Sequence, residues 1–210
     1  MIIPNTTQFQ ARIAEIIRGG GVIAFRTDTF YGLGADPFNE SAVRRIRRLK
    51  GREEAKPILL LISDLEEVDR FITNQSQLFN QVANRFWPGP LTVVSVARQA
   101  LPSVLTAGTK TIGLRLPDDE NLRALVRLCG GALTATSANT AGEPPARSAT
   151  EVENYFAQNI DLVQGIDLII DGGEVTATQP STVLDLTVAQ PRLIREGAIT
   201  REDLQEFGVR

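Results

Sequence analysis

The residues best suited to chemistry are Lys50-Gly51-Arg52 and Ser137-Ala138-Asn139. The first group closes a very basic helical segment, and the second lies in a predicted turn after a short apolar run. Lys and Arg supply fixed positive charge, whereas Ser and Asn supply small hydrogen-bonding groups. Together these residue types can hold phosphate or carboxylate and can stabilise charge that develops on phosphate oxygens. The two groups therefore predict a site for an anionic ligand.

The composition restricts the chemistry that such a site can use. The chain contains no histidine and one cysteine, Cys129. This excludes Ser-His-Asp and Cys-His catalysis, zinc bound by His or by thiolates, and an internal disulfide. Carboxylate or Lys chemistry, Mg²⁺ bound by oxygen atoms, and catalysis by positioning and electrostatics remain. The helical apolar pattern around Cys129 favours a small core residue over a nucleophile.

Cations crowd the end of the helical segment that Lys50 closes. Five of seven consecutive positions carry them: Arg44, Arg45, Arg47, Arg48 and Lys50. Such a run is usually a solvated helix face, but cations that repel one another also indicate an anionic partner. The formal net charge of the whole chain is −3, so we expect any nucleotide or RNA site to be a local patch.

Polar residues lie at the carboxyl ends of two of the predicted strands. Thr27-Asp28-Thr29 comes directly after a short apolar run, and Arg115 lies shortly before Pro117. Ligands collect at the carboxyl ends of strands in open α/β sheets, which predicts ligand contacts at both places. Thr and Asp in a turn also make local hydrogen bonds to the backbone, and an Arg in a strand can simply face solvent. The sequence leaves these interpretations open.

Alternating helices and strands position these residues. The hydrophobic patterns predict helices over 6–18, from 39 or 41 to 50, and over 65–71, 76–86, 118–129, 150–160 and 199–207. They predict strands over 22–25, 58–62, 91–96, 111–117, 132–136, 168–171 and 183–186, an edge strand over 192–197, and a loop over 101–110. The alternation indicates an α/β protein with one domain over residues 1–210, in which helices flank a twisted, mixed sheet.

The sequence also bears on location. No apolar run approaches the roughly 18 residues that a membrane span needs, and the first residues lack a basic segment followed by an apolar one. A single cysteine fits a reducing compartment. We therefore expect a cytoplasmic protein without membrane association.

Five motifs in register resemble the YrdC/TsaC family, the threonylcarbamoyl-AMP synthases. One is the Lys-x-Arg … Ser-x-Asn pair described above, and the others are Thr27–Gly34, Gly113–Pro117, Pro180–Val183 and Ile194–Gly197. The resemblance runs from about Gly19 to Gly197, and the chain ends soon afterwards, as in the short form of the family without an appended C-terminal domain. Lys56-Pro57-Ile58 and Leu61 depart from the family pattern, which often has Asn-Pro-Leu and His there.

The resemblance implies a reaction in which L-threonine, bicarbonate and ATP, accompanied by Mg²⁺, give threonylcarbamoyl-AMP and pyrophosphate. It implies Lys50 and Arg52 as catalytic residues that also bind ATP. It implies further ATP contacts by Lys56, Thr111, Ser137, Asn139 and Arg195, and threonine contacts by Thr29, Arg115 and Ser181. The threonylcarbamoyl group would then pass to adenosine in tRNA, directly or through partner modification proteins.

Two other interpretations stay open at this stage. One is an RNA-binding module of the YrdC type that uses the basic segment 44–52. RNA bound through its six cations would weaken steeply with salt, with a log–log slope approaching about 5. The other is a YciO-like paralogue that binds a nucleotide without synthase activity. The complete Lys-x-Arg and Ser-x-Asn set favours the synthase.

Overall fold

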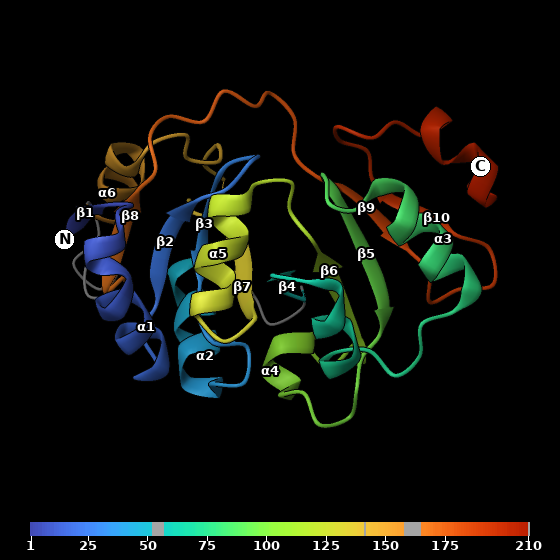
Figure 1. Ribbon diagram of the computed structural model, residues 1–210, viewed down its shortest axis with the longest axis horizontal. Coiled ribbons are helices and arrows are strands. Elements are labelled where there is room, and N and C mark those ends of the chain that lie inside the picture. The colour runs from blue at the N-terminus through green and yellow to red at the C-terminus, as the bar shows by residue number, and fades with distance from the viewer. Residues whose placement is uncertain (52–56, 141, 158–164, 210) are drawn as a thin grey trace.

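The computed structural model describes residues 1–51, 57–140, 142–157 and 165–209 (Figure 1). In these ranges ten strands form one sheet in the order β1-β8-β2-β3-β7-β4-β6-β5-β9-β10. The strands are β1 (Ile2–Pro4), β2 (Ile23–Arg26), β3 (Tyr31–Gly34), β4 (Leu59–Ile62), β5 (Leu91–Val96), β6 (Thr111–Arg115), β7 (Ala132–Ser137), β8 (Leu168–Asp171), β9 (Thr182–Asp185) and β10 (Arg192–Arg195).

Helices lie between most of these strands. They are α1 (Gln10–Arg18), α2 (Glu40–Leu49), α3 (Gln77–Phe86), α4 (Ser103–Thr106), α5 (Glu120–Leu128) and α6 (Ala149–Ala157), with 3-10 turns η1 (Thr7–Phe9), η2 (Leu65–Arg70) and η3 (Glu202–Phe207). Side-chain oxygens of Asn39, Ser76 and Asp119 accept hydrogen bonds from the first turns of α2, α3 and α5, and Asn39 is one of the two caps that the sequence predicts for α2. The alternation of helices and strands therefore has the predicted form.

The sheet is mixed, as predicted. Strand β2 pairs in parallel with β8, and β8 with β1, whereas β3 is antiparallel to both β2 and β7. Strand β4 runs parallel to β6 but antiparallel to β7, and β5 is antiparallel to β6 but parallel to β9. Strand β10 closes the order at one edge, antiparallel to β9. The predicted edge strand at 192–197 is thus confirmed.

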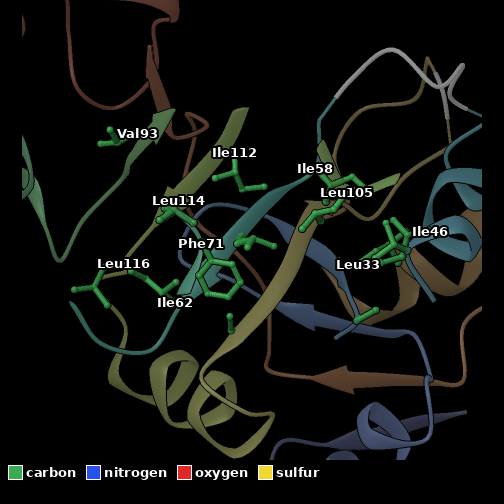
Figure 2. Packing of buried hydrophobic residues seen from close by; sticks show 14 of the residues in the cluster. Leu33, Ile46, Ile58, Ile62, Phe71, Val93, Leu105, Ile112, Leu114 and Leu116 are labelled. Carbon is green, nitrogen blue, oxygen red and sulfur yellow. The ribbon is translucent and has the colours of Figure 1, made fainter. Parts of the chain in front are cut away.

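Apolar side chains cover both faces of the sheet. The larger cluster packs α2, α3, α4 and α6 against the strands, and Figure 2 shows part of it, including Leu33 of β3, Ile46 of α2 and Leu105 of α4. The smaller cluster packs α1 and α5, which lie at the front in Figure 1, against the other face. Because helices cover the sheet on both sides, polar side chains that matter for a ligand must gather at strand ends. None of the described helices is both long enough and apolar enough to cross a bilayer.

The sequence prediction missed two strands. Strand β1 has only three residues and ends at a proline, so it carries almost no periodic signal. Strand β3 contains Gly32 and Gly34, which lower strand propensity. Gly34 is needed there, because a Cβ at this position would lie 2.5 Å from a ring carbon of Phe25. Close contact between β2 and β3 therefore requires a residue that hides the strand from sequence analysis. The predicted loop over 101–110 contains the short helix α4.

Cys129 is a core residue, as the sequence indicates. It lies in the smaller apolar cluster, and burial raises the pKa of its thiol from 9.0 to about 12. The folded protein therefore holds this proton more tightly than the unfolded chain does, so stability should fall as pH rises from about 9 towards 12 and should not depend on this group below pH 9. We expect a thiol reagent at pH 8 to label the denatured protein quickly and the native protein at least a hundred-fold more slowly, roughly in line with the lower thiolate fraction. Rapid native labelling would contradict the burial.

Candidate ligand-binding site

Lys50 follows the last residue of α2, and its ammonium group is buried at the end of β7. The residue is 3% exposed, and its Nζ donates hydrogen bonds to the backbone oxygens of Ser137 (2.7 Å) and Asn139 (2.6 Å). Nζ also donates to Ser137 Oγ at 3.2 Å and to Asn139 Oδ1. These four oxygens fix the position of the ammonium at the end of β7. The predicted association of the two sequence groups is present.

The segment after β7 is shaped to receive Lys50. Ala138 is fully buried, and its backbone N–H donates to Tyr31 O at 2.8 Å. Ser137 Oγ donates to Asn139 Oδ1 at 2.6 Å, and Asn139 Nδ2 donates to the backbone oxygen of Glu143. The Ser-x-Asn spacing thus buries the middle residue and places both polar side chains beside the ammonium of Lys50.

The other cations of α2 do not form one outward patch. Arg47 is 8% exposed, and its Nε donates to Val104 O at 2.8 Å. Arg45 donates to Gly165 O and forms an ion pair with Asp167. Arg44 pairs with Glu40 at 3.4 Å. Much of the positive charge in this helix therefore serves packing and pairing within the chain, which weakens the RNA-binding interpretation.

The turn between β2 and β3 contains both local hydrogen bonds and side chains directed at a polar cluster. Thr27 is 5% exposed and makes local bonds: its Oγ1 donates to Phe30 O at 2.6 Å and accepts from the backbone N–H groups of Thr29 and Phe30, both at 3.1 Å. Asp28 and Thr29 instead direct their side chains to Arg115. The threonine that precedes Asp28 therefore fixes the turn, while the next two residues contribute to a polar cluster.

Arg115 is the centre of that cluster. It ends β6, is 3% exposed, and donates from Nε to Gly89 O at 3.1 Å, from Nη1 to Thr29 Oγ1 at 3.3 Å and from Nη2 to Asp28 Oδ2. Burial lowers the pKa of Arg115, the Asp28 carboxylate opposes this, and the nearby charge of Arg195 adds to the lowering. A guanidinium nevertheless stays protonated at neutral pH. The strand Arg thus points into a polar cluster and does not face solvent.

Arg195 and Ser181 adjoin this cluster. Arg195 donates to the backbone oxygen of Ser181 at 2.8 and 3.1 Å and from Nη2 to its hydroxyl at 3.1 Å. The Ser181 hydroxyl also lies 3.2 Å from Thr92 Oγ1. The antiparallel pairing of Val93 with Leu114 places Thr92 opposite Arg115 across β5 and β6. Burial lowers the pKa of Arg195 as well.

The structure brings most of the predicted residues into two linked groups. We name the first the lysine group (Lys50, Ser137, Asn139) and the second the arginine group (Thr29, Arg115, Ser181, Arg195). The backbone connects them, because Tyr31, two residues after Thr29, accepts a hydrogen bond from Ala138, which lies between Ser137 and Asn139.

Thr111 is not beside Arg115. It begins the strand that Arg115 ends, about 13 Å away at roughly 3.3 Å per residue, and its hydroxyl bonds to Thr109 Oγ1 at 2.9 Å. Arg52 and Lys56 lie outside the described residues. Leu61, which departs from the family pattern, is 1% exposed and belongs to the core.

Sequence reasoning assigned no role to two residues that contact Arg115. Asp28 was part of a recognised motif, but its partner Arg115 lies 87 residues away in the sequence, so no local signal pointed to their pairing. Gly89 contributes through its backbone oxygen, so its side chain carries no chemical signal at all. A groove of about 460 Å³ between the N-terminal segment and α5, lined by residues such as Thr7, Gln10 and Asn121, contains none of the predicted site residues.

Substitutions of Ser137 and Asn139 separate structural from ligand-binding roles. Ser137→Ala leaves Lys50 three of its four acceptors, so the free energy of unfolding should fall by less than about 1 kcal/mol. Asn139→Ala removes an acceptor from a buried ammonium and a donor from Glu143 O, and should cost about 1–3 kcal/mol. If both also bind ATP, ATP affinity of the folded fraction should fall in both variants. Scanning calorimetry beside ATP titration measures the two quantities, and unchanged affinity would leave the loop a structural turn.

A family model and individual known proteins both match most of this chain. A model of one protein family, Sua5_yciO_yrdC, described as "Telomere recombination", matches residues 15–197. The threonylcarbamoyl-AMP synthase of Pyrococcus abyssi is 37% identical over 201 residues, which are 95% of this chain and 57% of that protein. The synthase of Thiobacillus denitrificans is 37% identical over 181 residues, which are 86% of this chain and 93% of that protein. This chain therefore spans little more than half of the first relative and nearly all of the second.

Solved structures give the same result. The crystal structure of P. abyssi Sua5 complexed with L-threonine matches with a TM-score of 0.92 at 35% identity, covering 100% of this chain and 62% of that one. The crystal structure of E. coli YciO matches with a TM-score of 0.80 at 28% identity, covering 94% of each chain. The mixed sheet and its flanking helices are thus shared with both proteins.

Proposed function

The chain belongs to the Sua5/YciO/YrdC family, and on that premise we propose that it is an L-threonylcarbamoyladenylate synthase. The amino group of L-threonine and bicarbonate give a carbamate with loss of water, and the carbamate and ATP then give threonylcarbamoyl-AMP and pyrophosphate. The curated relatives carry this activity in their names, and one solved relative was crystallised with L-threonine. The enzyme is then a nucleotidyltransferase in tRNA threonylcarbamoyladenosine modification.

One observation supports this proposal most strongly. The buried ammonium of Lys50 is held by oxygens of Ser137 and Asn139, and a second polar group is built around the buried guanidinium of Arg115. Two preorganised cations in neighbouring polar clusters suit a reaction between a polyphosphate and a carboxylate-bearing substrate. Neither cluster needs a group that titrates near neutral pH.

The chemical step can proceed without a histidine base. A threonine-derived carbamate oxygen attacks the α-phosphorus of ATP, a bond forms there, and the bond to pyrophosphate breaks. Such a transfer depends on alignment and on neutralisation of the charge that grows on the leaving oxygens. We assign that neutralisation to Lys50 and Arg52, with Lys56, Thr111, Ser137, Asn139 and Arg195 as further contacts of the nucleotide.

The arginine group suits the amino acid. A guanidinium presents a planar fork that matches a carboxylate. We assign the threonine carboxylate to Arg115, with the hydroxyls of Thr29 and Ser181 beside it. Arg195 bonds to Ser181 and lies within electrostatic range of Arg115, so it would connect the amino acid with the nucleotide.

Magnesium fits as a companion of ATP. Among the described residues no group of three or more His, Cys, Asp or Glu side chains could hold a metal ion. Mg²⁺ commonly binds through substrate phosphates with only one or two protein oxygens, so here it would be held mainly by the phosphates of ATP. Bound there, it would add positive charge against the leaving pyrophosphate.

The proposed product, threonylcarbamoyl-AMP, implies a further acceptor for its threonylcarbamoyl group. A carbamoyl-adenylate is an activated intermediate, so we propose that its threonylcarbamoyl group passes to tRNA, directly or through partner modification proteins. We also propose that residues 1–210 form one domain of the family type, since one sheet runs through the described ranges.

The similarity to E. coli YciO keeps a second candidate, a nucleotide-binding paralogue without synthase activity. Purified protein incubated with ATP, Mg²⁺, bicarbonate and L-threonine tests both. The synthase releases pyrophosphate only when threonine is present and needs no RNA. ATP binding without threonine-dependent release would remove the synthase and favour the paralogue.

A further inference from the structure

We propose that Asp28 recognises the amino group of the substrate, so that Asp28 and Arg115 together bind the two charges of an α-amino acid. The inference rests on the proposed function and deepens it, since it names the residue that distinguishes an amino acid from a simple carboxylic acid. The inference rests on the geometry of the Asp28 carboxylate, which bonds to Arg115 of the arginine group.

The two oxygens of Asp28 differ in their surroundings. Oδ2 accepts a hydrogen bond from Arg115 Nη2. Oδ1 is buried and has no hydrogen-bond donor within the described part of the chain, although the Asp28 side chain as a whole is 19% exposed. A buried acceptor without a donor destabilises a structure, and carboxylate oxygens are especially costly to leave unpaired. An N–H group of a ligand beside Arg115 would supply the missing hydrogen bond.

The charges of the cluster also favour an amino acid over an acid. An amino acid carries a carboxylate and an ammonium group on the same carbon, and Asp28 and Arg115 present the complementary pair side by side. A ligand with only a carboxylate would gain Arg115 but would approach the negative charge of Asp28. Like charges in a desolvated site disfavour binding strongly. Asp28 would therefore act as a specificity residue and not only as a partner of Arg115.

The turn that carries Asp28 is preorganised. The hydroxyl of Thr27 accepts hydrogen bonds from the backbone of Thr29 and Phe30 and donates to Phe30 O. These bonds close the turn around Asp28 without using its carboxylate. The position of the carboxylate is thus set by the backbone, which leaves Oδ1 available for the ligand.

Asp28→Asn tests the role, with Asp119→Asn as a matched control. Asp119 also accepts a hydrogen bond from an arginine, Arg26, and its side chain is 20% exposed, compared with 19% for Asp28. Asparagine at position 119 can still cap α5. Both variants remove one negative charge from an Asp–Arg pair, but only the first removes it from the proposed amino-group site.

Calorimetric titration should use two ligands, L-threonine and 3-hydroxybutanoate, which is threonine without its amino group. The wild-type protein should bind L-threonine at least ten-fold more tightly than 3-hydroxybutanoate. Asp28→Asn should lose threonine affinity by about ten- to a hundred-fold, as expected for a hydrogen bond to a charged group. Its affinity for 3-hydroxybutanoate should stay the same or rise. The ratio of the affinity for threonine to the affinity for 3-hydroxybutanoate should therefore fall towards one. Asp119→Asn should keep the wild-type ratio, and ATP affinity should stay within about two-fold in both variants.

The outcomes separate this inference from the proposed function. Wild-type protein that binds no threonine would overturn both. Wild-type protein that binds threonine but does not prefer it over 3-hydroxybutanoate, or Asp28→Asn that weakens both ligands equally, would overturn the role of Asp28 alone. If Asp28→Asn does not fold, Asp28→Glu decides: it retains the charge but moves it by one methylene, and the ligand ratio should fall part of the way.

Discussion

Lys50→Met should lower threonine-dependent pyrophosphate release by about a hundred- to a thousand-fold while the protein stays folded. The methionine side chain fills a similar volume but carries no charge. Removing one preorganised electrostatic contact to the transition state typically has an effect of this size. The backbone oxygens of Ser137 and Asn139 lose their donor, so the free energy of unfolding should also fall by about 1–3 kcal/mol. Activity must therefore be measured below the unfolding transition of the variant.

Arg48→Met is the matched control for Lys50→Met. Arg48 lies on the same helix, two residues earlier, and is exposed. This variant removes the same charge from α2 but leaves the lysine group intact, so pyrophosphate release should stay within about two-fold of wild type. Equal loss of activity in both variants would indicate that the helix acts through its total charge, as an RNA-binding surface would. Loss in Lys50→Met alone supports a specific position for the ammonium.

Much of the lysine group was predictable because its residues are chemically unusual for their places. A Lys directly after a helix and a Ser-x-Asn turn directly after a strand are more specific than a turn alone requires, and this marked them as candidates for a site. What the sequence could not supply was direction. Ser137 and Asn139 were expected to face a ligand, yet their oxygens surround Lys50. Residue types indicate which groups a site uses, but tertiary packing decides which of them face each other.

The basic helix shows what a sequence leaves out about charged residues. Its cations suggested an anionic partner because a sequence shows charges without their neighbours. Arg45 pairs with Asp167, which is 122 residues away, and Arg47 bonds to Val104 O from a segment predicted to be a loop. Partners at such separations leave no local trace in a single sequence. The same limit hid the contact between Asp28 and Arg115, whose separation is 87 residues.

The fold was predictable wherever side-chain periodicity and capping agreed. Helices α2, α3 and α5 begin at polar caps and carry regular apolar faces, so their positions followed directly. Strand β3 was hidden because the glycines that permit its close contact with Phe25 also weaken its strand pattern. Its absence from the prediction mattered, since β3 is the strand that joins the turn at Asp28 to the segment after β7.

Arg115→Lys should raise the Michaelis constant for threonine by about ten- to a hundred-fold and change that for ATP by less than about two-fold. Lysine keeps the positive charge but cannot reproduce the fork that now bonds to Gly89 O, Thr29 Oγ1 and Asp28. Losing one charge-assisted hydrogen bond costs about 1.5–3 kcal/mol, which gives the expected range. Steady-state kinetics with each substrate varied in turn measures the effect.

Arg26→Lys is the control for Arg115→Lys, because Arg26 pairs with Asp119 at 3.2 Å but belongs to neither polar group. It should leave both Michaelis constants near their wild-type values. Arg52→Ala provides the contrast within the site: if Arg52 opposes the charge that grows as pyrophosphate leaves, the variant should lower the turnover number more than it changes threonine affinity. A rise in the constant for ATP alone in Arg115→Lys would assign Arg115 to the triphosphate. The carboxylate of threonine would then need a different cation, and Arg195, which already bonds to Ser181, is a candidate among the described residues.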